Sequence, residues 1–145
     1  VPGHTVGHIA YYFPESGALF SADSLMVMGC GRLFEGSAEQ MWNTLSKLAA
    51  LPDETEIYSG HEYANGNLQF ALSVDGDNQA LQARAKDIEA ALAAGRPTVP
   101  ARLDLERATN PFLRAMATDM KAKLGMASAG DAETFAELRQ RKDNF

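Results

Sequence analysis

The sequence changes its hydrophobic pattern near residue 61, and this change constrains the fold more than any other feature. Before it, short apolar segments alternate with turns: residues 8–13 (HIAYYF) run into a PESG turn, residues 18–21 lead to Asp23, and residues 56–59 (EIYS) end at Gly60. Short apolar segments bounded by turn residues are typical of β-strands. We therefore expect strands over most of the first sixty residues.

One helix is expected among these strands. Ser37, followed three residues later by Gln40, forms a capping-box sequence, and Met41, Leu45 and Leu48 recur on one helical face. Strands that alternate with a helix favour an α/β or α+β layer over an all-β sandwich.

The segment that follows reads as helical. We divide the chain into residues 1–66, which carry the strands, and residues 67–145, which carry helices. The expected helices are residues 67–74, a longer helix capped by Asp77 and ended by Gly95, a helix over residues 110–124, and a last helix capped by Asp131.

Composition excludes several classes of function. The chain has 145 residues and a net charge of -6, which argues against nucleic acids and anionic membranes as partners. No apolar run is long enough to span a bilayer. The one cysteine, Cys30, excludes an intrachain disulfide and suits a reducing compartment such as the cytoplasm. The chain opens on a Gly-His turn without an initiator Met, as if cut within a domain.

Three residues have the chemistry of metal ligands. His4, Asp23 and His61 each stand where a strand-like segment meets a turn, and such side chains suit Zn, Fe or Mn. Their wide spacing forms no compact ligand motif, so ordinary turn residues are the alternative interpretation.

Short strings spread along the whole chain narrow these alternatives. They are PGHTVGHI (2–9), SADSL (21–25), GCGRLFEG (29–36), GHEY (60–63), TVP (98–100), NPFLR (110–114) and RKDNF (141–145). Together, and in this order, they resemble glyoxalase II, the hydroxyacylglutathione hydrolase family of the metallo-β-lactamase superfamily.

The resemblance implies a fold and an activity. The fold would be part of an αββα metallo-β-lactamase sandwich, followed by a helical C-terminal domain that binds glutathione. The activity would be hydrolysis of S-2-hydroxyacylglutathione thioesters such as S-D-lactoylglutathione, a step in methylglyoxal detoxification. It would be a binuclear metal enzyme with two divalent ions, Zn or else Fe or Mn, which share the attacking hydroxide.

It also implies roles for single residues. His4 and His61 match histidine ligands of the first and second metal, and Asp23 matches the carboxylate that bridges both. Arg32 and Tyr63 match residues that contact the glutathione peptide.

On the last helix, Arg139 and Lys142 match basic groups that hold the glycine carboxylate. The alternative for this basic end is a solvated helix C-terminus that complements the helix dipole. His8 is expected to be structural, and Cys30 is expected to be a small turn residue rather than a nucleophile.

The chain departs from the family pattern in one respect. The family's other metal ligands come from an upstream THxHxDH motif, and no such string occurs among the three histidines here. We therefore expect weak metal binding and little thioesterase activity from this chain alone, and a sheet with one uncovered apolar face. The missing N-terminal segment is a candidate partner. Two rivals stay open: a mononuclear-iron dioxygenase of glutathione persulfide, and a non-catalytic glutathione-binding fragment.

Overall fold

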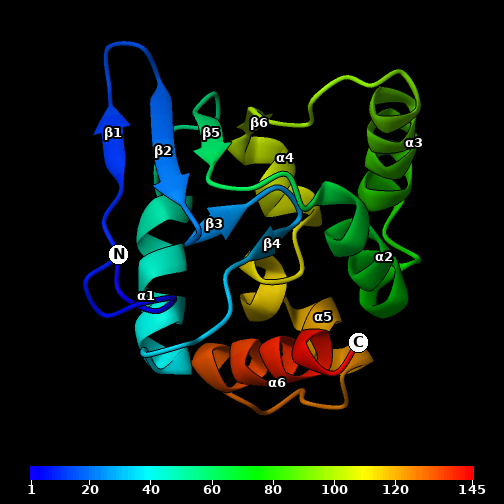
Figure 1. Ribbon diagram of the computed structural model, residues 1–145. Coiled ribbons are helices and arrows are strands. Elements are labelled where there is room, and N and C mark those ends of the chain that lie inside the picture. Colours follow the sequence, from blue (N-terminus) through cyan, green and yellow to red (C-terminus); the bar gives the residue numbers. More distant parts are fainter.

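The computed structural model describes residues 1–145 as a mixed α+β fold, which confirms the predicted class (Figure 1). The main sheet has the order β1-β2-β5-β6, in which β2 and β5 are parallel and the outer pairs are antiparallel. A two-stranded hairpin, β3-β4, follows β2. The strands are β1 (Tyr11–Phe13), β2 (Ala18–Ala22), β3 (Leu25–Met26), β4 (Gly29–Cys30), β5 (Glu56–Ser59) and β6 (Ala101–Arg102).

Helices make up most of the second half. In Figure 1, α1 lies behind the sheet, α6 runs along the bottom of the molecule, and α2 and α3 form the side away from β1. Helix α1 packs against α6, and α2 packs against α3. The helices are α1 (Ala38–Ala49), α2 (Ala64–Asp75), α3 (Gln79–Ala93), α4 (Leu103–Thr109), the 3-10 helix η1 (Leu113–Met116), α5 (Thr118–Lys123) and α6 (Asp131–Asp143). None of them combines the length and the apolar character needed to cross a bilayer.

The two faces of the sheet have different environments. The strand register aligns Tyr12, Leu19 and Ile57 in one row, and this row faces the core. The next row, on the opposite face, holds Tyr11 and Phe20, which are 60% and 46% exposed, beside Tyr58. Side chains alternate between faces along a strand, so one face is buried and the other stays open. The predicted uncovered apolar face is confirmed.

The core joins the strand-rich and the helical halves. The largest buried apolar cluster contains Leu19 and Ile57 from the sheet, Met41 from α1, and Phe112 and Phe135 from the second half. Burial of apolar surface of this kind is the main stabilising term in folding. The two units proposed from the sequence therefore share one core, and the boundary at residue 66 stays a prediction.

The predicted N-terminal cap is correct for α1 and wrong for α3 and α6. The Ser37–Gln40 capping box is present in both directions. Helix α3 is capped by Asn78, whose side chain accepts hydrogen bonds from the backbone N–H groups of Ala80 and Leu81, and not by Asp77. Asp131 is the first residue of α6 and forms no cap; its carboxylate instead pairs with Lys121.

The single helix predicted over residues 110–124 is also wrong. Helix α4 ends at Thr109, and the chain then forms η1 and α5 as separate short elements. The side chain of Asn110 accepts a hydrogen bond from the backbone N–H of Phe112 and donates to Gly29, so its bonds serve tertiary structure. A proline at position 111 further disfavours helical backbone at Asn110.

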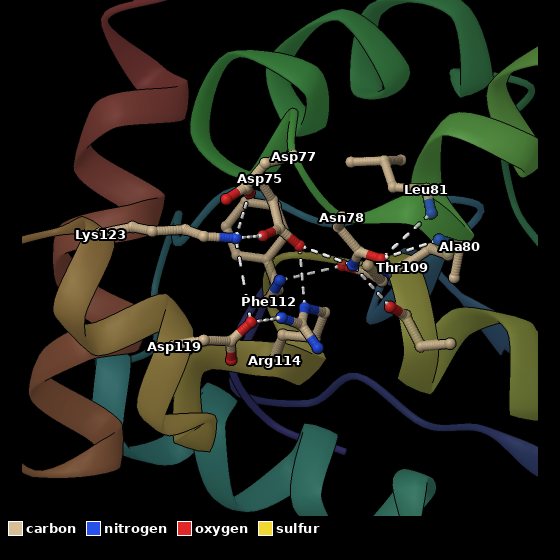
Figure 2. Close-up of polar contacts among 12 residues, drawn as sticks. Asp75, Asp77, Asn78, Ala80, Leu81, Thr109, Phe112, Arg114, Asp119 and Lys123 are labelled. Atoms are coloured by element: carbon tan, nitrogen blue, oxygen red, sulfur yellow. Dashed lines mark hydrogen bonds and ion pairs between the residues drawn. The ribbon is translucent and has the colours of Figure 1, made fainter.

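A buried carboxylate joins the helices of the second half (Figure 2). Asp75, at the end of α2, is fully buried and accepts a hydrogen bond from Arg114 Nε at 2.9 Å. Lys123 pairs with the same carboxylate and reaches Asp77 at 2.5 Å, so the carboxylate of Asp77 has an ion-pair partner rather than a role in capping α3. Paired charges of this kind avoid the large cost of an isolated buried ion.

Candidate metal and substrate site

The three predicted ligand residues meet at one edge of the sheet. The Nδ1 atom of His61 lies 2.6 Å from Oδ1 of Asp23, and Nε2 of His4 lies 3.6 Å from its Oδ2. All three line an open hollow of about 620 Å³. Residues far apart in the sequence are thus brought together in a position that is accessible to a ligand.

Strand topology explains this meeting. Asp23 follows β2 and His61 follows β5, and these two strands are parallel, so their carboxyl ends lie at the same edge. The approach is close: a Cβ atom at Gly60 would lie 2.8 Å from Oδ1 of Asp23. Ligand sites of α/β folds are commonly formed by the loops at such an edge.

The orientation of His4 is fixed by a backbone carbonyl. Its Nδ1 atom lies 2.8 Å from the carbonyl oxygen of Arg32. A carbonyl oxygen only accepts hydrogen bonds, so Nδ1 carries the proton and donates it. This leaves Nε2 free on the side of Asp23. Histidine ligands of metals are commonly held in this way by their second ring nitrogen.

His8 has a structural position beside the site. Its Nε2 atom accepts a hydrogen bond from the backbone N–H of Asp23 at 3.1 Å. Burial lowers the pKa of His8, and the neighbouring His4 lowers it further, which favours the neutral ring that can accept this bond. The structural role expected for His8 is confirmed by this contact.

The side chains at this edge are of the types that bind a divalent metal ion, but there are few of them. Imidazole nitrogen and carboxylate oxygen are the ligands that Zn, Fe and Mn share. His4, Asp23 and His61 point toward one another, yet no group of three or more His, Cys, Asp or Glu side chains is arranged so that it could hold a metal ion by itself.

Two of the predicted substrate-binding residues have cationic groups with weak protein partners: Arg32 lies near Asp143, and the Lys142 ammonium donates to the Gly66 carbonyl oxygen at 3.5 Å. The side chain of Arg32 is 62% exposed, and its nearest acidic partner is Asp143, at 3.6 Å. The Lys142 ammonium lies 5.8 Å and 5.7 Å from the ring centroids of Phe70 and Phe145. Burial lowers the pKa of Lys142, and the nearby arginines lower it further. Both cations line the hollow and suit an anionic ligand.

The other two predicted contacts are arranged differently. The ring of Tyr63 stacks on that of His61, with centroids 4.9 Å apart and an angle of 1° between planes. Arg139 is only 5% exposed, and its guanidinium donates to the Cys30 carbonyl oxygen at 2.9 Å and to Asp143 at 2.8 Å. The structure thus gives Arg139 protein partners, and its contact with substrate stays a prediction.

Three further residues line the hollow, and the sequence analysis gave them no role in the site. Phe34 lies beside His4, with ring centroids 5.0 Å apart, and Asn67 enters from α2. Glu62 accepts a hydrogen bond from the backbone N–H of Thr98 at 2.9 Å. The GHEY and TVP strings therefore meet in space. In the sequence, the family resemblance was the only sign that these two strings belong together.

The part of the chain that carries the parallel-strand edge and its histidine and aspartate residues is similar to the metallo-β-lactamase superfamily: the family model described as "Metallo-beta-lactamase superfamily" matches residues 1–61. A second model, "Hydroxyacylglutathione hydrolase C-terminus", matches residues 62–145, which is more than half of the chain. The chain belongs to the hydroxyacylglutathione hydrolase family.

Individual relatives agree with this assignment. The chain is 61% identical over 145 residues to a hydroxyacylglutathione hydrolase of Ruegeria pomeroyi, which covers 100% of the chain and 57% of that protein. It is also 55% identical over 144 residues to a hydroxyacylglutathione hydrolase of Rhizobium meliloti, and the match covers 99% of the chain and 56% of that protein. Among solved structures, ETHE1 from Myxococcus xanthus matches with a TM-score of 0.57 and 25% identity, over 97% of the chain and 42% of that protein. The chain thus spans little more than half the length of the two hydroxyacylglutathione hydrolases.

Proposed function

We propose that this chain forms the C-terminal part of a metal-dependent hydrolase of S-2-hydroxyacylglutathione thioesters. The observation that carries the proposal is that His4, Asp23 and His61 line one hollow together with the cationic side chains of Arg32 and Lys142. The proposal also rests on membership of the hydroxyacylglutathione hydrolase family.

In this proposal His4, Asp23 and His61 would hold the divalent ions, with the Asp23 carboxylate lying between the two histidine side chains. Such ions, whether Zn, Fe or Mn, lower the pKa of bound water to about 7 and polarise a carbonyl oxygen. His4 is prepared for this role because its Nδ1 proton is committed to Arg32, so Nε2 presents its lone pair. The remaining ligands would come from a segment outside residues 1–145, since the relatives are longer than this chain.

The cationic wall binds the peptide part of the thioester. Glutathione carries two carboxylates, and an arginine fork or a lysine ammonium beside the hollow pairs with such groups. Arg32 and Lys142 are the candidates, with Tyr63 as an aromatic contact next to His61. The leaving thiolate is stable enough to depart without a strong general acid, since thiols ionise near pH 8.5.

A chimeric protein tests the proposal. The N-terminal part of the Ruegeria pomeroyi relative, which lies outside the match, is joined to residues 1–145. We expect the chimera to bind metal and to release thiol from S-D-lactoylglutathione, and the 145-residue chain alone to do so weakly. Asp23→Asn in the chimera should lower kcat/KM by about 100-fold or more. Asp104→Asn is the matched control, because Asp104 lies outside the hollow and its carboxylate contacts only Arg102 and the backbone N–H of Leu105.

Other outcomes would contradict the proposal. A folded, metal-loaded chimera that produces sulfite from glutathione persulfide, and no thiol from the thioester, would assign it to the dioxygenase class. A chimera that binds glutathione and turns over neither substrate would leave a binding function only. Equal turnover by the wild type and Asp23→Asn would exclude the ligand role of Asp23.

A further inference from the structure

Glu106 is a charged residue in an unexpected position. It lies on α4 with no exposed surface, and its carboxylate pairs with the buried Arg84 of α3. The same carboxylate accepts hydrogen bonds from the backbone N–H of Met28 at 3.0 Å and from Asn110 Nδ2 at 2.9 Å. An apolar pair of similar size is often as stable as a buried ion pair, so stability alone does not account for these groups. Their directed hydrogen bonds indicate a positional role.

Through its hydrogen bond with Met28, Glu106 binds the turn of the β3-β4 hairpin. Met28 has a φ of 60°, which is unusual for a residue other than glycine. Two further side chains bind the same hairpin: Asn110, directly after α4, donates to the Gly29 carbonyl oxygen at 3.0 Å, and Asn67 of α2 donates to that of Val27 at 3.0 Å. Each strand of the hairpin has only two residues. The helices, more than the strand ladder, therefore determine where the hairpin lies.

The hairpin in turn contacts the candidate ligands. The N–H of Gly31, directly after β4, donates to the Asp23 carbonyl oxygen at 2.8 Å, and the next residue, Arg32, accepts the Nδ1 proton of His4. The approach leaves no free space, since a Cβ atom at Gly31 would lie 2.3 Å from the Asp23 carbonyl oxygen and 2.8 Å from His4 Nδ1. A displaced hairpin must therefore move both contacts.

We propose that Glu106 is a positioning residue for the site: it holds the β3-β4 hairpin so that Gly31 and Arg32 orient Asp23 and His4. As a role in hydrolysis this rests on the proposed function. The physical coupling itself, from a buried carboxylate through the hairpin to the tautomer of His4, is a property of the folded chain.

Two double variants of the 145-residue chain separate positioning from stability. Arg84→Met with Glu106→Leu removes the ion pair and also the acceptor for Met28. Arg84→Met with Glu106→Gln removes the ion pair and retains an amide oxygen as acceptor. Both replace the charges with neutral groups of similar size, so thermal unfolding should show that both fold. The readouts are the tautomer of His4, from long-range ¹H–¹⁵N NMR couplings, and amide exchange at Met28 and Gly31.

The Leu variant should lose the uniform Nδ1–H tautomer of His4, and the exchange of both amides should accelerate about tenfold or more. The Gln variant should keep the wild-type pattern. An unchanged His4 tautomer and unchanged exchange in the Leu variant would overturn the proposal, as would equal changes in both variants. If the Leu variant does not fold, amide exchange of the wild type still tests the proposal. Rapid exchange of the Met28 amide would overturn it, because such exchange is incompatible with a hydrogen bond to a buried carboxylate. These readouts involve no substrate, so they fail or succeed independently of thioester hydrolysis.

Discussion

Arg139 Nη1 donates a hydrogen bond to the carbonyl oxygen of Cys30 at 2.9 Å and thereby fastens α6 to the strand that leads into the candidate site. The same guanidinium lies 5.0 Å from the ring centroid of Phe112 and pairs with Asp143 one turn along the helix. The residue predicted from the sequence as a carboxylate-binding group is thus also a structural link between the two halves.

Loss of this link should lower stability. For Arg139→Met we expect the free energy of unfolding in urea to fall by about 1.5–3 kcal/mol, since hydrogen bonds to charged groups contribute about that much. Arg141→Met is the matched control, because Arg141 is 44% exposed in its side chain and pairs only with Glu137. Its effect should stay near 0.5 kcal/mol. Equal effects would show that Arg139 is no structural link.

Cys30 should make the folded chain sensitive to alkaline pH. Burial raises the pKa of its thiol from the ordinary 9.0 to about 11, although Arg139 nearby acts in the opposite direction. Since the folded-state value exceeds the unfolded one, this contribution to stability is complete below pH 9 and is lost as the pH rises through 11. The loss amounts to roughly 3 kcal/mol.

The test compares urea unfolding of the wild type and Cys30→Ala from pH 7 to pH 11. The alanine variant is expected to start less stable, because it leaves a small cavity, and to lose less stability above pH 9. Parallel curves would contradict the raised pKa. The same shift implies slow alkylation of the native thiol at pH 7, and fast alkylation once the chain is unfolded, which mass spectrometry measures.

Lys142 should contribute to ligand binding more than to stability. In the chimera, Lys142→Met is expected to raise KM for the thioester about tenfold with little change in kcat, the pattern of lost uniform binding. The methionine retains the apolar stem that lies near Phe70 and Phe145. Lys86→Met, on α3 outside the hollow, is the control. A fall in kcat at constant KM would assign Lys142 a different role.

The parts of the fold that sequence analysis predicted are those with local causes. The capping box at Ser37 and the turn after Ser59 involve neighbouring residues, and α1 and β5 follow as expected. The β3-β4 hairpin was missed because two-residue strands have no periodicity and because its determinants, Glu106 and Asn110, lie far along the chain. Asp77 failed as a cap for a similar reason, since its carboxylate has a partner in Lys123.

The candidate site also has features that the sequence predicted and features that depend on tertiary packing. Motif resemblance identified His4, Asp23 and His61, and the parallel pairing of β2 with β5 accounts for the meeting of Asp23 and His61. Burial was not predictable, because the face that α6 turns inward depends on packing against α1 and η1. Arg139 therefore emerged as buried, whereas Arg32 remained exposed.

The uncovered sheet face should make the isolated chain associate. The exposed rings of Phe13 and Phe20 pack edge to face, with centroids 5.9 Å apart, and Phe20 stacks on the half-buried ring of Tyr58, so the three rings form one contiguous aromatic patch. Such patches mark surfaces that are covered in an assembly, and each Å² removed from water contributes about 25 cal/mol. Phe20→Lys is expected to shift the chain toward monomer in sedimentation velocity. Met116→Lys, at a 62% exposed position on η1, should not. In the chimera the patch should be covered, so that self-association disappears without any substitution; a wild-type chain that is monomeric at every concentration would contradict this account of the face.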